Sequence, residues 1–271
     1  MRIKDTNAVV TGANSGIGRA VCAELAKRGA SRIAMVDRSD HVKDQARELN
    51  RDAGRDVGEP FIGDVCDAGF RTAVFDALCE RDGVVNILVP AAGVTKDALA
   101  VRVDKETFQP HIYPVEDFRL VVEVNLISPV YWAMEMIGRV AARRARHGLK
   151  RWAAAEDVQG TIIFIGSVSR QGNKGQVSYA ATKAGLEGAA ATLTKEAMFH
   201  GVRTGVIHPG FTNTPMVHKL PDDYIAQHVL PYTQLQRLIE PEEIADAICF
   251  MIGNSAVSGE LWADAGWHPA A

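Results

Sequence analysis

Thr11-Gly12-Ala13-Asn14-Ser15-Gly16-Ile17-Gly18 is a glycine-rich stretch that follows a short β-branched run and leads into an apolar helical pattern. In this context Gly12 permits a tight turn and Gly16 lets the backbone approach a pyrophosphate. Gly18 lets the helix pack closely on the strand, and the helix N-terminus offers free N–H groups and positive potential. The stretch predicts a dinucleotide site. No Gly-Lys-Ser/Thr follows it, so a P-loop nucleotide hydrolase is not supported.

Short β-branched runs alternate with helix-length segments along almost all of the 271 residues. This alternation predicts a single α/β domain, a doubly wound (Rossmann) parallel sheet of about seven strands with helices on both faces. The expected strands span residues 8–10, 32–36, 60–62, 85–89, 161–165, 203–207 and 260–263. The expected helices span residues 18–28, 42–52, 70–81, 115–145, 177–200 and 241–252.

The composition is that of an ordinary globular chain, with 47% hydrophobic residues and a net charge of -3. That charge argues against a general nucleic-acid or anionic-membrane surface. The cysteines show no paired spacing, which favours buried thiols in a reducing compartment. No signal-peptide pattern opens the chain, and no uninterrupted apolar run reaches the ~18 residues of a membrane helix. We therefore expect a cytoplasmic protein without nucleic-acid or membrane partners.

Three segments interrupt the strand–helix rhythm. Residues 101–114 contain two prolines and are expected as a surface excursion. Residues 139–160 are first basic and then acidic, which fits a solvated helix extension or a docking surface. Residues 212–240 are amphipathic and follow a strand, so they would lie at the carboxyl edge of the sheet as a substrate lid. The apolar residues of this lid suit a hydrophobic or ring-bearing substrate, or equally a lid that packs on the body.

Asp37 and Arg38 follow the second expected strand. A carboxylate at that place can accept hydrogen bonds from both ribose hydroxyls and would repel a 2′-phosphate. Asp37 therefore favours NAD over NADP. Arg38 is the competing signal, since its guanidinium could pair with a 2′-phosphate if Asp37 turned away. A solvated Asp-Arg pair in a turn is the structural alternative.

Tyr179 and Lys183 lie four residues apart in Ser-Tyr-Ala-Ala-Thr-Lys-Ala-Gly. On a helix these positions share one face, which would place an ammonium beside a phenol. A neighbouring cation favours the phenolate and so would lower the phenol pKa. Such a pair could move a proton on or off an alcohol.

These features together resemble the compact, single-domain branch of the short-chain dehydrogenase/reductase family, over nearly the whole chain. Two departures stand out. Pro90-Ala91-Ala92-Gly93 replaces the usual Asn-Asn-Ala-Gly or Asn-Ala-Ala-Gly, which removes a structural Asn and an N–H group. The segment from Ser167 to Tyr179 is also one residue shorter than the commonest spacing, so Ser169 competes for the serine role. Ser167 is preferred because it directly follows an apolar run. The matching positions are the glycine-rich turn, Asp64-Val65, Ala92-Gly93, Asn125, Ser167, Tyr179, Lys183, Pro209-Gly210, Thr214, Ser258-Gly259 and Asp264-Ala265-Gly266.

The resemblance implies a role for each member of the catalytic set. Tyr179 would be the general base, and Lys183 would stabilise the phenolate and hold the nicotinamide ribose. Ser167 would hydrogen-bond the substrate oxygen, and Asn125 would hold a water that links Lys183 to solvent. Asp64 and Val65 would contact the adenine end. The full set of expected cofactor contacts is Gly12, Asn14, Ser15, Gly16, Ile17, Gly18, Asp37, Arg38, Asp64, Val65, Ala91, Ala92, Gly93, Tyr179, Lys183, Pro209, Gly210, Thr212 and Thr214.

The leading hypothesis is an NAD-dependent oxidoreductase for a secondary alcohol or its ketone, such as a 3-hydroxyacyl thioester or a hydrophobic cyclic alcohol. The C-terminal segment is similar to that of 3-oxoacyl-carrier-protein reductases, whereas Asp37 argues against their usual NADPH-dependent biosynthetic role. A non-catalytic dinucleotide sensor predicts loss of Tyr179 or Lys183, and both are present. A nucleotide-sugar epimerase or dehydratase would need a larger C-terminal domain.

Two further expectations concern binding partners. The resemblance implies a homo-oligomer, a tetramer or a dimer. No metal is expected, because the histidines lack metal-ligand spacing. His208 could touch the cofactor or serve as a buried residue at the end of a strand.

Overall fold

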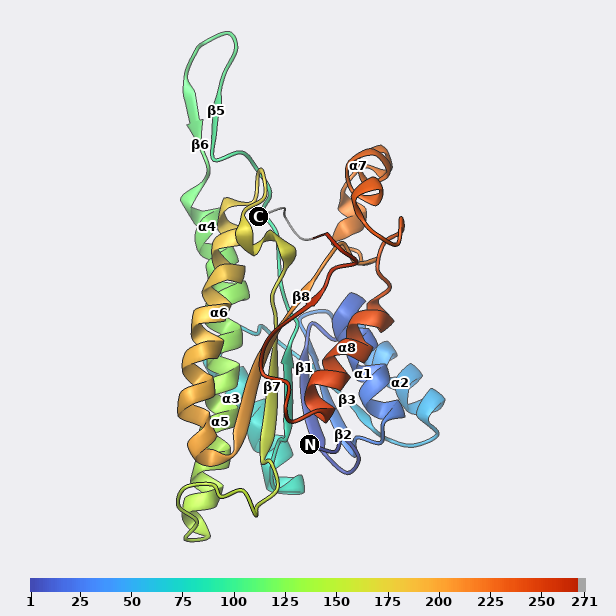
Figure 1. Ribbon diagram of the computed structural model, residues 1–271, viewed down its shortest axis with the longest axis vertical. Helices are drawn as coiled ribbons and strands as arrows, with labels where there is room; N and C mark the ends of the chain where they lie inside the picture. The colour runs from blue at the N-terminus through green and yellow to red at the C-terminus, as the bar shows by residue number, and fades with distance from the viewer. Residues whose placement is uncertain (268–271) are drawn as a thin grey trace.

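The computed structural model describes residues 1–267, with the side chains of all of these except residues 81 and 82. The expected parallel sheet is confirmed, with the strand order β3-β2-β1-β4-β7-β8-β9 (Figure 1). Its strands are β1 (Asn7–Thr11), β2 (Arg32–Asp37), β3 (Gly58–Ile62), β4 (Ile87–Pro90), β7 (Gly160–Ile165), β8 (Val202–Pro209) and β9 (Gly259–Ala263). The order reverses between β1 and β4, the place where open α/β sheets bind ligands.

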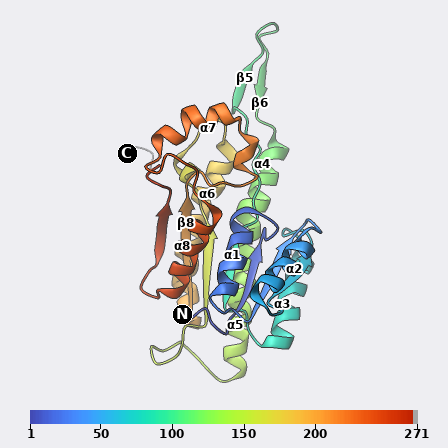
Figure 2. The same cartoon turned by 90° about the vertical axis from the view of Figure 1, so that its right-hand side faces the viewer.

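Helices cover both faces of this sheet (Figures 1 and 2). One face packs against α1 (Gly16–Lys27), α2 (Val42–Ala53) and α8 (Pro241–Gly253). The other packs against α3 (Ala68–Asp82), α5 (Ser128–Arg146) and α6 (Val177–Ala197). Successive strand residues point to opposite faces. Accordingly Val10 lies in the first apolar core and Val9 in the second, and both are fully buried.

The helix expected at 115–145 is present but is not uniform. It consists of α4 (Val115–Val122), a π-helical turn (Glu123–Ile127) and α5. By length and composition Val115–Arg146 could cross a membrane, the one such helix in the part of the chain that the structure describes. Trp132 and Met136 are nevertheless fully buried against the sheet, so this helix packs as a core element.

The excursion at 101–114 forms a small hairpin of β5 (Val101–Val103) and β6 (Pro110–Ile112). It projects from the end of α4, beyond the carboxyl edge of the sheet (Figures 1 and 2). The lid segment contains α7 (Asp222–His228) and lies across from this hairpin. Its two ends are joined, because the Asn213 N–H donates to the Ile239 carbonyl oxygen over 2.7 Å. The lid is therefore a closed loop anchored at its base.

The basic-then-acidic segment departs from the expected solvated extension at Arg144. This side chain is 2% exposed and donates to both carboxylate oxygens of Glu156, over 2.5 and 3.1 Å. It also donates to the Lys150 carbonyl oxygen. The two opposite charges therefore meet inside the segment and fold it back on α5, since a buried guanidinium requires a charged, hydrogen-bonding partner.

Candidate active site

The glycine-rich turn leaves no room for side chains where it meets neighbouring backbone. Gly12 has a φ of +67°, and a Cβ there would lie 2.8 Å from the Ala92 nitrogen. A Cβ on Gly18 would lie 2.2 Å from the carbonyl oxygen of Gly12. Both distances are shorter than real Cβ contacts. The turn can therefore adopt this shape, and bring the start of α1 against β1, only with glycine at these two positions.

Asp37 lies at the end of β2 and ties this turn to the second strand. One carboxylate oxygen accepts from the Asn14 N–H over 3.2 Å, and the other accepts from the Ser39 N–H over 3.0 Å. These two bonds fix a negative charge beside the glycine-rich turn. Arg38 is exposed and lines the same cavity as Asp37.

Pro90 is accommodated because the sheet does not need its missing N–H group. The pairing of β4 with β7 covers Ile87 and Leu88 and ends before Pro90. The segment that follows Pro90 is held by β1 instead, because the Ala92 N–H donates to the Thr11 hydroxyl over 3.1 Å. Thr11 therefore supplies a side-chain contact to the segment in which the usual Asn is absent.

Asn125 lies in the π-helical turn and is 1% exposed. Its Oδ1 accepts from the Val94 N–H and its Nδ2 donates to the Val94 carbonyl oxygen, each over 2.8 Å. The amide thus pairs with a whole backbone unit, as a neighbouring strand would. This contact positions the Ala91–Val94 segment, a role that the spacing of residues in the sequence does not reveal.

Tyr179 and Lys183 occupy the first turns of α6, and Ser167 lies two residues after the end of β7. The Lys183 ammonium donates to the Ile165 carbonyl oxygen over 2.7 Å and lies 5.4 Å from the centre of the Tyr179 ring. The Ser167 hydroxyl lies close enough to the Tyr179 phenol to lower its pKa. The three residues therefore converge at the carboxyl end of β7.

The expected lowering of the Tyr179 pKa by Lys183 does not occur in this structure. Burial raises the pKa of Tyr179 to about 12, and the hydrogen bond with Ser167 opposes that rise only in part. Burial also lowers the pKa of Lys183 to about 8. The reason is geometric, because the ammonium bonds a backbone carbonyl and faces the Tyr179 ring.

Ser167 and Ser169, the two candidates for the serine role, differ in their contacts. The Ser169 N–H donates to the Ser167 hydroxyl oxygen over 3.1 Å, which makes Ser167 the N-cap of a short 3₁₀ turn (Val168–Gln171). The Ser167 hydroxyl also lowers the pKa of the neighbouring Tyr179 phenol. Both serines line the same cavity, but Ser167 is the one whose hydroxyl acts on the phenol, so it remains the preferred candidate.

Two cavities of about 500 Å³ each meet at Tyr179. One extends along the glycine-rich turn to Asp37, and we refer to it as the cofactor cavity. Lys183 lines the cofactor cavity but not the second cavity, whereas Tyr179 lines both. The expected cofactor residues that line it are Gly12, Ser15, Gly16, Ile17, Gly18, Asp37, Arg38, Asp64, Val65, Ala91, Ala92, Gly93, Tyr179, Lys183 and Thr214.

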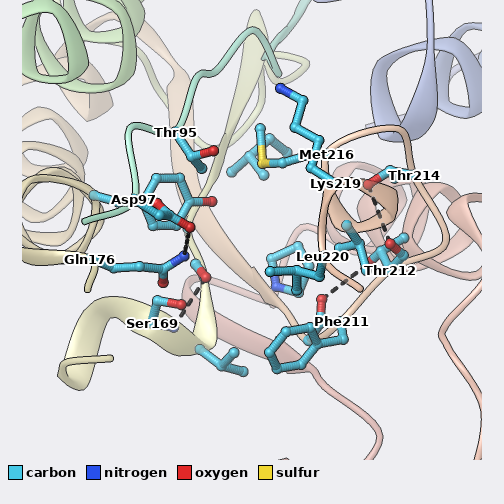
Figure 3. A pocket seen from close by; sticks show the side chains of 18 of the residues that line it. Thr95, Asp97, Ser169, Gln176, Phe211, Thr212, Thr214, Met216, Lys219 and Leu220 are labelled. Atoms are coloured by element: carbon cyan, nitrogen blue, oxygen red, sulfur yellow. Dashed lines mark hydrogen bonds between the residues drawn. The ribbon is translucent and has the colours of Figure 1, made fainter. Parts of the chain in front are cut away.

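The second, which we call the substrate cavity, lies between the body and the lid. In Figure 3 its polar wall is opposite the lid residues, and Gln176 donates to Asp97 over 2.8 Å. Pro209, Gly210 and Thr212 line this cavity and not the cofactor cavity, while Asn14 lines neither. Its labelled residues are Thr95, Asp97, Ser169, Gln176, Phe211, Thr212, Thr214, Met216, Lys219 and Leu220.

Several of these residues were not expected from the sequence. Gln176 lies three residues before Tyr179, so the helical period could have placed it at the site. Thr95 and Asp97 have no such periodic signal. They precede an irregular segment and a hairpin, so their position in space could not be predicted from the sequence. Met216 and Lys219 line both cavities from within the expected lid.

Comparisons with known proteins show the family to which the chain belongs. The family described as Enoyl-(Acyl carrier protein) reductase matches residues 12–268. The chain is 33% identical to the 3-oxoacyl-(acyl-carrier-protein) reductase FabG of Escherichia coli over 263 residues, 96% of each protein. It is 31% identical to the acetoacetyl-CoA reductase of a Synechocystis strain, covering 98% of this chain and 97% of the relative. It is also 31% identical to a (3R)-3-hydroxyacyl-CoA dehydrogenase of Canis lupus familiaris, covering 94% and 92%. The chain belongs to the short-chain dehydrogenase/reductase family of nicotinamide-dependent oxidoreductases.

Proposed function

We propose that this protein is an NAD-preferring dehydrogenase/reductase that interconverts a secondary alcohol and its ketone, with a 3-hydroxyacyl or 3-oxoacyl thioester as the first substrate class to test. One observation carries the proposal. Tyr179 is part of the wall that the two cavities share, with the Ser167 hydroxyl beside its phenol and Lys183 on the cofactor side. A proton donor at that wall can reach a carbonyl in one cavity while the other holds a hydride carrier.

Each residue of the site has a distinct proposed task. In reduction Tyr179 gives its phenolic proton to the carbonyl oxygen, and in oxidation it takes the proton from the alcohol. Ser167 donates a hydrogen bond to the same substrate oxygen and shares its developing charge. Lys183 holds the ribose side of the cofactor cavity and carries the positive charge that a phenolate requires. When bound, the nicotinamide supplies or accepts the hydride.

Asn125 acts on this site chiefly through the Val94 backbone, which it holds beside the cofactor cavity. The proposed water that would link Lys183 to solvent is assigned to the same π-helical turn. Because the amide oxygen already accepts from Val94, that water would share the oxygen or use a neighbouring backbone carbonyl.

The preference for NAD rests on Asp37. Its carboxylate is fixed by two backbone N–H groups and faces the end of the cofactor cavity where an adenosine ribose would lie. A fixed negative charge accepts hydrogen bonds from ribose hydroxyls and repels a phosphate. Arg38 is the residue that would favour NADP, and it is exposed beside Asp37.

The substrate class is supported by what three relatives share. Their names describe a 3-oxoacyl carrier-protein reductase, an acetoacetyl-CoA reductase and a 3-hydroxyacyl-CoA dehydrogenase, all of which act on an oxygen at the third carbon of an acyl thioester. The mixed polar and apolar walls of the substrate cavity also admit a hydrophobic cyclic alcohol. The proposal includes a cytoplasmic homo-oligomer, a dimer or a tetramer.

A substrate panel tests this proposal. Hydroxyacyl-CoA esters of increasing chain length and secondary cyclic alcohols are incubated with NAD or NADP, and the absorbance of the reduced cofactor is followed. We expect turnover of a 3-hydroxyacyl-CoA with NAD. A non-catalytic dinucleotide sensor would instead bind NADH and turn over none of these compounds, and the convergence of Ser167, Tyr179 and Lys183 argues against that alternative.

A further inference from the structure

His208, near the end of β8, is fully buried and lines neither cavity. Its Nδ1 accepts a hydrogen bond from the Ser167 N–H over 3.3 Å. A neutral imidazole that accepts at Nδ1 carries its proton on Nε2. Burial lowers the pKa of His208, although Glu260 opposes this, so the ring remains in that neutral form.

The second ring nitrogen of His208, Nε2, also has a hydrogen-bonding partner. Its Nε2 lies 3.1 Å from Oε2 of Glu260 on β9 and donates to it. The ring also stacks on Trp262, with 4.6 Å between the ring centres. Because a histidine is oriented by the partner of its second nitrogen, Glu260 fixes both the tautomer and the orientation of His208.

Arg170 fixes Glu260 in turn. Its guanidinium donates to Glu260 over 3.0 Å, pairs with Glu187 on α6 and lies 5.1 Å from the centre of the Trp262 ring. Glu187, His208 and Glu260 could also hold a metal ion, since their ligand atoms lie within 4.8 Å of one another. Arg170 pairs with both carboxylates, so the cluster is better described as an arginine-centred network.

Within residues 1–267, the His208 ring is the acceptor recorded for the Ser167 N–H. A Cβ on Gly166 would lie 2.4 Å from Nδ1 of His208, so the ring occupies the space directly under the turn between β7 and Ser167. The Gly166 N–H continues the pairing of β7 with β8 by donating to Ile207, and the Ser167 N–H is the first beyond it. His208 therefore replaces a backbone acceptor at the point where the strand ends.

The geometry points to His208 as a positioning residue for the proposed reaction, with Glu260 holding it from behind. By accepting the Ser167 N–H, His208 sets where the Ser167 hydroxyl lies relative to Tyr179 and the substrate oxygen. This inference rests on the proposed function of Ser167. In this role His208 contacts neither substrate nor cofactor. The role therefore differs from the cofactor contact that was one of the two expectations from the sequence.

Two isosteric substitutions separate the nitrogen atoms of His208. In His208→Asn the amide oxygen can occupy the Nδ1 position and still accept from Ser167. In His208→Gln the amide nitrogen can reach the Nε2 position and still donate to Glu260, while the Ser167 N–H loses its partner. The Ser167 hydroxyl is then no longer held in place relative to the substrate oxygen, so kcat should fall about tenfold for the Gln variant. The Asn variant should keep several-fold more turnover than the Gln variant, and neither should change the Kd of NADH.

A double-mutant cycle shows whether His208 acts through Ser167. Ser167→Ala alone should lower kcat by roughly 100-fold, as expected for removal of one donor to a developing oxyanion. Combined with His208→Gln, it should lose no more than about another threefold. Surface His147→Gln is the matched control, and thermal unfolding of every variant reports whether the fold is retained.

Each outcome is informative. If the losses multiply in the double variant, or if His208→Gln matches wild type, His208 does not position Ser167 and this inference fails. If Ser167→Ala itself retains full turnover, the proposed role of Ser167 fails first, which separates the two conclusions. A larger loss for the Asn variant than for the Gln variant would also contradict the assignment of Nδ1 as the important atom.

Discussion

Lys183 donates a hydrogen bond to the Ile165 carbonyl oxygen over 2.7 Å, and this bond joins α6 to the end of β7. The ammonium is buried, and its pKa falls from 10.5 to about 8 because burial penalises the charged form. A buried charge without a carboxylate partner costs stability. The position is therefore one where function and stability are expected to conflict.

Replacing Lys183 with Met should separate the contribution of this residue to function from its contribution to stability. Turnover should fall at least roughly 100-fold, because the phenolate of Tyr179 loses its neighbouring cation. The free energy of unfolding at pH 7 should stay equal or rise, because the buried charge is removed and the apolar stem is kept. Urea unfolding of both proteins measures this. A variant that is both inactive and strongly destabilised would show that Lys183 is chiefly structural.

The same substitution predicts a pH dependence of stability. Because the folded-state pKa of Lys183 is depressed to about 8, the unfolded chain binds more protons between that value and 10.5. The stability of wild type relative to Lys183→Met should therefore rise from pH 8 to 10, by up to the order of 3 kcal/mol. A difference that stays constant over this range would contradict the depressed pKa.

The two directions of the reaction should respond oppositely to pH. With its pKa raised to about 12, the free-enzyme Tyr179 is protonated and ready to donate to a ketone, so kcat/KM for reduction should be flat below pH 8. Above pH 8 it should fall as Lys183 loses its proton. For oxidation, kcat/KM should rise from pH 6 to 8, because the phenol must first lose its proton, and should level off above pH 8, where Lys183 also loses its proton. A fall in oxidation over that range would count against Tyr179 as the base.

Asp37→Asn should change cofactor preference. It removes the charge that repels a 2′-phosphate but keeps an amide oxygen for the Asn14 N–H. The ratio of kcat/KM for NAD to that for NADP should fall at least about tenfold, the effect of a single nearby charge. Arg38→Ala is the matched control and should move the ratio the other way. An NADP preference in wild type would overturn the role given to Asp37.

Gly18→Ala tests the glycine-rich turn. The added Cβ would lie 2.2 Å from the Gly12 carbonyl oxygen, so α1 must shift away from β1. NADH binding should weaken by roughly tenfold or more, together with a loss of about 2 kcal/mol of stability. Gly253→Ala, where no atom lies within 4 Å of the added Cβ, should change stability by less than about 1 kcal/mol. Equal effects of the two would mean that the tight packing at Gly18 is unimportant.

The sheet and its helices could be predicted from the sequence because periodicity and glycine placement are local signals. The strands at 32–36 and 161–165 and the helix at 42–52 form within a residue or two of their expected ends. The convergence of Tyr179 with Lys183 likewise follows from helical spacing. These features depend on residues that are close in the chain, so a single sequence carries them.

The features that escaped prediction depend on contacts between distant segments. Asn125 pairs with Val94, Arg144 is buried by Glu156, and His208 meets Ser167 across two strands. The raised pKa of Tyr179 also escaped, because it depends on the direction in which Lys183 points. Neither the hairpin at 101–112 nor the π-helical turn has a periodic signature, since each interrupts an otherwise regular pattern.

Turnover by Tyr179→Phe tests the central claim most directly. The variant keeps the ring and loses the phenolic oxygen, whose pKa the neighbouring Ser167 hydroxyl lowers. It should bind NADH with the wild-type Kd, measured by fluorescence, and should oxidise the best 3-hydroxyacyl-CoA at least about 1000-fold more slowly, within the range for loss of a general base. Turnover at the wild-type rate would contradict the account, because no proton transfer at Tyr179 would then be needed.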